Sequence, residues 1–338
     1  MSVDTTTTLP VLREVDCRWL LGLYALIPLV LLIVLLDSLP GGGWLRRSLP
    51  NDPMHWPFWT LVFGLPHIVA SFVSMADRDY LQHYRRRLLW PLLGFAALST
   101  LGYVGPQPLS YQLLFVFLAF YTIYHVLAQQ LGLSLMMLGI APSPVFRAWK
   151  WLSVLAGFAI YMNVYGATYI GRLSLGSLDI YLMLRYMAAA LCAAVMVLAW
   201  QLTWQARHRI GVWYLWGNVA LLLSAFVINE AGYTLFVILI PRVIHDVTAY
   251  IIYISHDSNR NRQQPVNLIY RMARVTRLPV WLLLPLLSGL IAYVLTYYQQ
   301  LPLIGIVILT LSFLHYYVEG FIWRTPNPHR SYLAFKRQ

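Results

Sequence analysis

The stretch WLLGLYALIPLVLLIVLL, residues 19–36, carries no charged side chain and is apolar along its whole length. About 20 such residues in a helix cross the ~30 Å hydrocarbon core of a bilayer. The stretch follows a leader with both acidic and basic side chains, and no small-residue cleavage site comes before Asp37. We therefore interpret it as a first membrane span and not as a cleaved signal peptide, whose apolar region is shorter.

Comparable apolar runs recur along the rest of the chain. Of its 338 residues, 59% are hydrophobic and 11% are charged, with a mean hydropathy of +0.63, which is too apolar for a water-soluble protein. Because no long polar insert separates the runs, we predict a single membrane domain, residues 1–338, that folds as an all-α transmembrane helix bundle of about ten spans. The predicted spans lie at residues 19–37, 56–75, 88–105, 111–138, 149–165, 179–203, 212–229, 232–255, 279–298 and 301–323.

The basic residues are distributed unevenly among the loops between these spans. Most lie in the even-numbered loops and the C-terminal tail, whereas the odd-numbered loops hold Arg46, Arg47 and Arg172. Because basic loops stay in the cytoplasm, both termini are expected there, in an N-in/C-in topology. The formal net charge of +12 then reflects loops that face anionic membrane lipid, without a nucleic-acid partner. We expect an integral protein of a bacterial inner (plasma) membrane.

Histidines are the main ionisable residues inside the predicted spans. His67, His125, His245 and His315 lie in the second, fourth, eighth and tenth runs, which all travel from outside to inside, and His256 ends the eighth run. Ionisable residues are costly in lipid and mark functional sites. Neutral imidazole is a common ligand for iron, copper and zinc. These five histidines are therefore the expected metal ligands, and we expect the first four rings to converge.

Other polar residues accompany the histidines. Gln129 and Glu319 each lie four residues after a histidine, on the same helix face, so we expect Glu319 to act at the metal and Gln129 to lie beside it. Asp246 and Asp257 directly follow a histidine and are expected to orient the ligands or to pair with neighbouring arginines. Tyr253, three residues before His256, is expected to donate a hydrogen bond near the site. Three histidines in loops or the tail are predicted to lie at the surface: His55, His208 and His329.

The segment Gly64-Leu65-Pro66-His67 resembles the Gly-x-Pro-His element of the Brp/Blh-type carotenoid dioxygenases. These membrane enzymes bind non-haem iron through histidines from several helices. The HxxxH and HxxHH clusters of the fatty-acid desaturases and hydroxylases are absent from this sequence. The resemblance implies that His67 is an iron ligand. The aspartate that the family carries shortly after the element is replaced here by Val69-Ala70-Ser71, so neither that residue nor the substrate is carried over.

The pattern favours an intramembrane metal-dependent oxidoreductase of the oxygenase, hydroxylase or desaturase type. It would use non-haem iron and O₂, take a lipophilic substrate from the bilayer, and have an electron donor as a further partner. Two alternatives remain open. A haem b protein that exchanges electrons with quinone would use histidine pairs as axial ligands, and a proton-coupled transporter would relay protons through the histidines.

Overall fold

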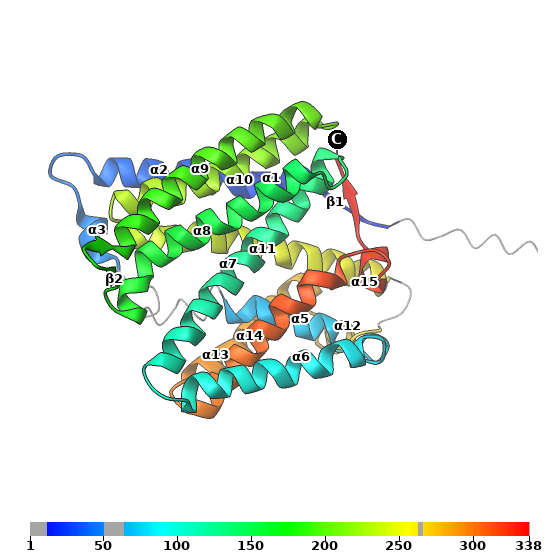
Figure 1. Ribbon diagram of the computed structural model, residues 1–338. Helices are drawn as coiled ribbons and strands as arrows, with labels where there is room; N and C mark the ends of the chain where they lie inside the picture. The colour runs from blue at the N-terminus through cyan, green and yellow to red at the C-terminus, as the bar shows by residue number, and fades with distance from the viewer. Residues whose placement is uncertain (1–11, 51–63, 263–265, 338) are drawn as a thin grey trace, which may run out of the picture.

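The computed structural model describes residues 12–50, 64–262 and 266–337 (Figure 1). Within these ranges, nine helical segments are long and apolar enough to cross a membrane. The first runs from Cys17 to Asp37 as α1 (Cys17–Gly22), the short 3-10 helix η1 (Leu23–Ala25) and α2 (Leu26–Asp37). The other eight are α6 (Arg78–Val104), α7 (Leu109–Leu138), α8 (Pro144–Ile170), α9 (Ile180–Gln205), α10 (Arg209–Glu230), α11 (Thr234–Arg260), α13 (Val280–Tyr297) and α14 (Pro302–Ile322).

The remaining predicted span, residues 56–75, contains the shorter apolar helix α5 (Leu65–Met75). Residues 56–63 of that span lie outside the described residues. Pro66 occupies the first turn of α5, where a missing backbone N–H breaks no helical hydrogen bond. Each of the ten predicted runs therefore contains a helix, which confirms the all-α helical class.

Two helices begin earlier than their apolar runs. α6 begins at Arg78 and not near residue 88, because the Asp77 side chain caps it by accepting a hydrogen bond from the Tyr80 N–H at 2.9 Å. Its first turns carry arginines that we expected in a loop. α8 likewise begins at Pro144, capped by Ser143. The length of an apolar run predicts which part of a helix crosses the membrane. It does not predict how far polar residues extend the helix beyond that part.

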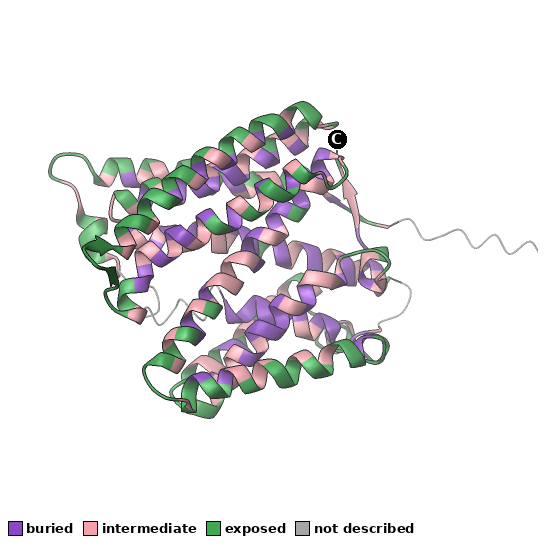
Figure 2. Ribbon diagram, in the orientation of Figure 1, coloured by how far each residue is buried: buried purple, intermediate pink, exposed green. Residues whose placement is uncertain are grey.

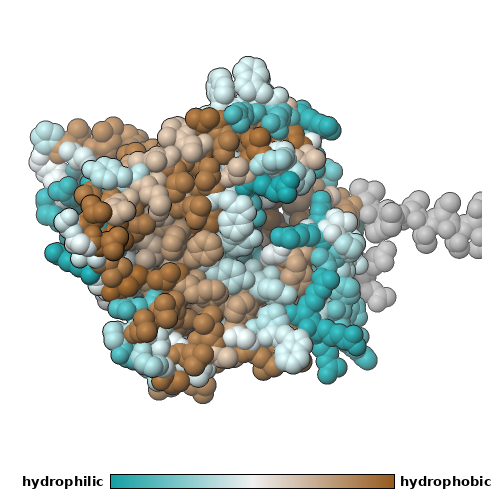
Figure 3. All heavy atoms as spheres, viewed as in Figure 1, coloured by the Kyte–Doolittle hydropathy of each residue, from teal (hydrophilic) through white to brown (hydrophobic). Residues whose placement is uncertain are grey.

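The helices bury one side against one another and expose the other. α7 packs against both α8 and α10, and α5 packs against α11, α13 and α14. Figure 2 shows buried residues along these inward faces and exposed residues on the outer faces. Large apolar side chains are among the exposed residues, including Trp90, Trp200 and Leu290. Figure 3 shows the apolar surface over the middle of the visible face, as expected of helices that contact lipid.

The two described ends of the chain meet at one end of the bundle. Strand β1 (Glu14–Asp16) pairs in parallel with β4 (Ala334–Lys336), with Val15 opposite Phe335. Short helices α12 (Leu268–Thr276) and α15 (Pro328–Ser331) lie at the same end in Figure 1. The start of α6 and the end of α11 are there too, and they contribute five arginines. We call this the basic end; its arginines include Arg78, Arg85, Arg86, Arg87 and Arg260.

The opposite end of the bundle is closed by shorter elements. It holds α3 (Trp44–Ser48) and the antiparallel pair β2 (Ser174–Leu175) and β3 (Leu178–Asp179) (Figure 1). Asp37, at the end of α2, accepts hydrogen bonds from the backbone N–H groups of Leu45 and Arg46. These contacts tie α3 to the first span.

Candidate metal centre

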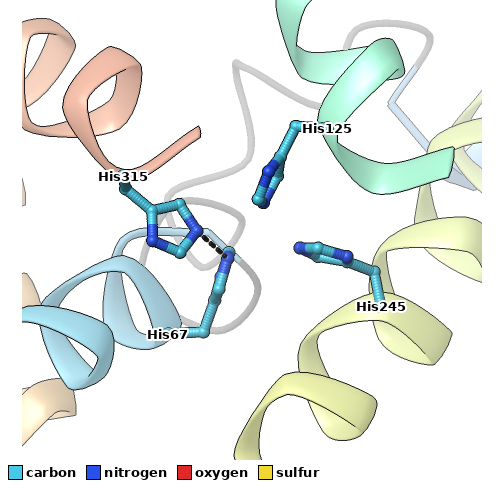
Figure 4. Close-up of side chains that lie close together, drawn as sticks. All are labelled: His67, His125, His245 and His315. Carbon is cyan, nitrogen blue, oxygen red and sulfur yellow. Dashed lines mark hydrogen bonds between the residues drawn. The ribbon is translucent and has the colours of Figure 1, made fainter. Parts of the chain in front are cut away.

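Four histidines from four different helices meet inside the bundle (Figure 4). His67 comes from the start of α5, His125 from the middle of α7, His245 from α11 and His315 from α14. Each is at most 4% exposed. Their rings point toward one another across the space between the helices. The convergence expected from the sequence is therefore present in the structure.

The spacing of these imidazoles suits a common metal ion. Choosing one ring nitrogen from each histidine gives four atoms that all lie within 4.8 Å of one another. The ring centroids of neighbouring pairs are 4.7 to 5.0 Å apart. Two nitrogens bound to one metal at about 2.0–2.2 Å are at most about 4.4 Å apart. Because 4.8 Å exceeds this limit, the rings would have to move inward by at least a few tenths of an ångström to share one ion.

Hydrogen bonds decide which nitrogen of His315 faces the centre. Its Nδ1 lies 2.7 Å from the Ser71 Oγ, and Ser71 in turn donates its own hydroxyl proton to the Ile68 carbonyl at 2.7 Å. Because a serine hydroxyl has one proton to donate, Ser71 accepts from the Nδ1–H of His315. The Nε2 of His315 is then unprotonated and directs its lone pair into the centre.

His67 meets both another histidine and a carboxylate. Its Nδ1 lies 3.0 Å from Asp246 Oδ1, but Nδ1 and both carboxylate oxygens of Asp246 are buried without a hydrogen-bond partner among the described residues. The Nε2 atoms of His67 and His315 form a hydrogen bond at 3.1 Å, drawn as a dashed line in Figure 4. Because the Nε2 of His315 is unprotonated, His67 donates its Nε2–H to it. A cation bound at the centre would displace that proton from between the two nitrogens.

His125 and His245 also leave polar atoms without partners. His125 Nε2 and both ring nitrogens of His245 are buried and have no hydrogen-bond partner among the described residues. Each such atom costs about 1–3 kcal/mol of desolvation unless it is satisfied. Metal coordination would satisfy one nitrogen on each ring. The donor set therefore fits a metal ion better than a packed core.

Two buried carboxylates border the four histidines. Asp246 lies 3.0 Å from His67 Nδ1 and 3.6 Å from the Arg242 Nε, so it contacts a histidine of the group and pairs with an arginine. Glu319 Oε2 lies 3.8 Å from His125 Nε2, and Oε1 accepts a hydrogen bond from the Tyr253 hydroxyl. Tyr253 thus acts on Glu319. Gln129 is half-buried, and its Oε1 accepts a hydrogen bond from Gln130. Among the described residues, no contact joins Gln129 to the four histidines.

His256 belongs to a different place and is not part of the four-histidine group. It follows His245 by eleven residues on α11, about 16 Å along the axis, which is too far for a shared ion although the face is similar. Its Nδ1 hydrogen bonds to Asp257 Oδ1 at 2.8 Å and its Nε2 to the Tyr80 hydroxyl at 2.9 Å. Asp257 therefore orients His256, while Arg260 pairs with Asp77.

The surface prediction for His329 was wrong, since this residue is 1% exposed. Pairing of β4 with β1 brings α15 back onto the bundle, and the His329 ring stacks on Tyr80 at 3.8 Å and on His256 at 4.9 Å. Burial, together with the nearby His256 and Arg260, lowers the pKa of His329 to about 2, so the ring is neutral. His208 is half-buried, and His55 lies outside the described residues.

Sequence reasoning also missed Ser71 as a partner of the centre. The signal was available, because Ser71 lies four residues after His67, the same spacing that identified Glu319. Arg242 was considered only as a partner of Asp246. It also lines an apolar cavity between α7, α8, α10 and α11, together with Val126, Leu127, Ile160, Leu222 and Val237.

The geometry does not suit haem b. In haem, the porphyrin holds four positions around the iron, and the protein supplies at most the two axial ligands. Four imidazoles with ligand atoms within 4.8 Å of one another leave no plane for the macrocycle. A bare metal ion needs no such plane, so all four nitrogens can approach it.

Comparison of the chain with protein-family models, with curated proteins and with solved structures finds no match. The site must therefore be interpreted from its own chemistry.

Proposed function

We propose that this protein is an intramembrane metal-dependent oxidoreductase of the oxygenase type, with non-haem iron in the four-histidine centre. The observation that carries the proposal is the meeting of four buried histidines whose ligand nitrogens lie within 4.8 Å of one another. Four imidazoles arranged in this way can bind a cation.

The ligand type supports iron. Imidazole suits iron, copper, nickel and zinc, and structural zinc sites commonly include cysteine. Both cysteines of this chain, Cys17 and Cys192, are free and buried elsewhere in the bundle. The resemblance of Gly64-Leu65-Pro66-His67 to the Brp/Blh-type element points to the same metal. Bound iron would supply the activation of dioxygen, while the buried helices exclude water and Glu319 holds the hydrogen bond from Tyr253.

A lipophilic substrate is supported by the apolar cavity between α7, α8, α10 and α11. Its walls come from the helices that carry His125 and His245, and Arg242 provides its charged group. Its volume, about 50 Å³, is well below the roughly 300–1,000 Å³ of ligand pockets. A lipid-sized substrate would therefore have to displace side chains as it enters from the bilayer.

Metal analysis of the purified protein tests the proposal. We expect detergent-purified protein, produced with added iron, to hold about one iron ion per chain and to show no Soret band. Alanine at each of the four histidine positions should abolish iron binding, since each change removes a ligand. Iron-loaded protein should consume oxygen when supplied with a lipophilic substrate and a reductant, and zinc-loaded protein should not.

His208→Ala is the matched control, because His208 is a half-buried histidine outside the centre, and its iron content should equal that of the wild type. Wild-type protein that holds no metal after reconstitution would refute the proposal and leave the proton-coupled transporter. A Soret band that disappears in His67→Ala and His315→Ala would replace the proposal with the haem b alternative.

A further inference from the structure

A chain of aromatic side chains leads from the metal centre to the basic end of the bundle. It begins at Tyr253, which is 1% exposed and donates its hydroxyl proton to Glu319 Oε1. The other oxygen of Glu319 lies 3.8 Å from His125 Nε2. Tyr253 is therefore separated from a ligand of the centre by one carboxylate.

Trp323, directly after α14, continues the chain. Its indole stacks on Tyr253, with ring centroids 6.2 Å apart and an angle of 23° between the planes. Its ring centroid also lies 5.7 Å from that of His256 and 5.6 Å from that of His329, both in edge-to-face arrangements. α11, the residue after α14, and α15 thus place their rings next to one another.

Tyr80 forms the far end of the chain. Its ring stacks on His329 at 3.8 Å, and its hydroxyl lies 2.9 Å from His256 Nε2. The Nδ1 of His256 donates to Asp257 Oδ1 at 2.8 Å, and Ser74 donates to the same oxygen at 2.7 Å. With its proton on Nδ1, His256 accepts from Tyr80 at Nε2.

The chain reaches the protein surface through a charged group. The guanidinium of Arg260 lies over the Tyr80 ring at 3.6 Å and pairs with Asp77 and with Asp79, whose side chain is 72% exposed. Tyr80 itself is 2% exposed. A reductant at the basic end would therefore come within one side chain of Tyr80.

Resting on the proposed function, we propose that Tyr253, Trp323 and Tyr80 carry single electrons from a one-electron donor at the basic end to the metal centre. The chemistry of the chain fits this role, because each phenol that would lose an electron already donates its proton to a base. That base is Glu319 for Tyr253 and the imidazole of His256 for Tyr80. The indole of Trp323 can lose an electron without a proton acceptor.

Each transfer is balanced. Tyr253 would lose one electron to bound iron that dioxygen has oxidised beyond the ferric level, and its O–H bond would break as the proton moves to Glu319. Trp323 reduces the resulting phenoxyl, which recovers that proton, and Tyr80 reduces Trp323 while its own proton moves to His256. The external donor then reduces Tyr80, and His256 returns the proton. The net result is one electron moved from donor to centre.

The rate of iron reduction tests the chain with a readout other than turnover. Ferrous protein is mixed rapidly with dioxygen, ascorbate is then added as a one-electron donor, and the reduction of the oxidised iron to the ferric form is followed by rapid-freeze EPR. We expect Trp323→Phe to slow reduction roughly tenfold, equivalent to about 1.4 kcal/mol of added barrier. Trp323→Tyr should restore the rate, because tyrosine can be oxidised and phenylalanine cannot.

Tyr317→Phe is the matched control, since Tyr317 lies on α14 but packs against Phe95 and Phe321, outside the chain. Its reduction rate should equal that of the wild type. Equal rates for the wild type and for an iron-loaded Trp323→Phe would overturn the chain while leaving the metal centre intact. Should Trp323→Phe fail to retain iron, Tyr80→Phe, which removes a single hydroxyl far from the centre, decides in the same way. Wild-type protein without iron would overturn both proposals.

Discussion

At the residue scale, each imidazole has one ring nitrogen that faces the candidate metal centre and one that faces away from it. The partner of the outer nitrogen also affects metal binding. For His315 that partner is Ser71, whose Oγ accepts a hydrogen bond from Nδ1, and for His67 the carboxylate of Asp246 lies 3.0 Å away. A hydrogen bond such as the one to Ser71 fixes the tautomer and the ring angle of a metal ligand and raises its basicity. The segment of apolar and small residues that follows His67 in the sequence thus contains a hydroxyl group, that of Ser71, which contacts His315.

Replacing Ser71 by alanine should weaken metal binding without removing a ligand. The Nδ1–H of His315 would lose its acceptor and the ring would be free to turn, so we expect affinity to fall about 10–100-fold. Competition with a chelator of known affinity measures the change. Ser312→Ala is a matched control, because the Ser312 hydroxyl lies on the same helix as His315 and bonds to the Ile308 carbonyl. Equal affinities for Ser71→Ala and the wild type would show that Ser71 does not orient His315.

At the element scale, a single helix contributes residues to two separate sites. α11 carries His245 at the metal centre and His256 near the basic end, and α14 carries His315 and Glu319 before leading to Trp323. The short helix α15 would be marginal by itself, yet it places His329 against Tyr80 and His256 because β4 anchors the tail to β1. Helix geometry sets the spacing of residues along each helix. The packing of the helices against one another determines to which site each residue contributes.

The buried ring of His329 should make stability depend on pH. Its pKa is lowered to about 2 in the folded protein, whereas an exposed histidine titrates near 6.5. Between these values the unfolded chain binds the extra proton, so folded stability is fully present above about pH 6.5 and falls as the pH decreases, by at most about 1.4 kcal/mol per pH unit. Thermal unfolding in detergent between pH 7 and pH 5 should show a smaller decline for His329→Asn than for the wild type. Parallel declines would contradict this prediction.

At the scale of the whole molecule, the bundle has an apolar middle and two different ends (Figures 1 and 3). Both described termini lie at the basic end, joined by β1 and β4, and the predicted even number of crossings would place both termini on one side of the membrane. The proposed electron path also opens there. The positive-inside rule predicts that this end faces the cytoplasm, where reductants are available.

Reporter fusions test this orientation. Because α8 begins at Pro144, the second even loop is best probed at Pro142, and a further fusion follows Arg277 between α12 and α13. Both should report a cytoplasmic location, whereas fusions at Gly105 and Gln300, at the other end, should report an external one. An external signal at Pro142 would reverse the predicted topology and place the electron donor outside the cell.

The sequence by itself determined the helices and the meeting of four histidines. Span length and the i,i+4 spacing of His315 and Glu319 are local properties, set by the 1.5 Å rise of a helix and the thickness of lipid. The similar depth of His67, His245 and His315 followed from the same counting. Convergence was then the arrangement that left the fewest buried imidazoles unpaired.

The tertiary structure alone decided which atoms meet. His67 and His315 are 248 positions apart in the chain, and the rotation and tilt of their helices, which no local pattern specifies, set the angle of each ring. The same packing placed Asp246 on His67 and assigned His256 to Tyr80 instead of the metal centre. It also brought His329 from the tail into the core, because strand pairing between the two ends of the chain is a long-range contact that the sequence of either end does not encode by itself.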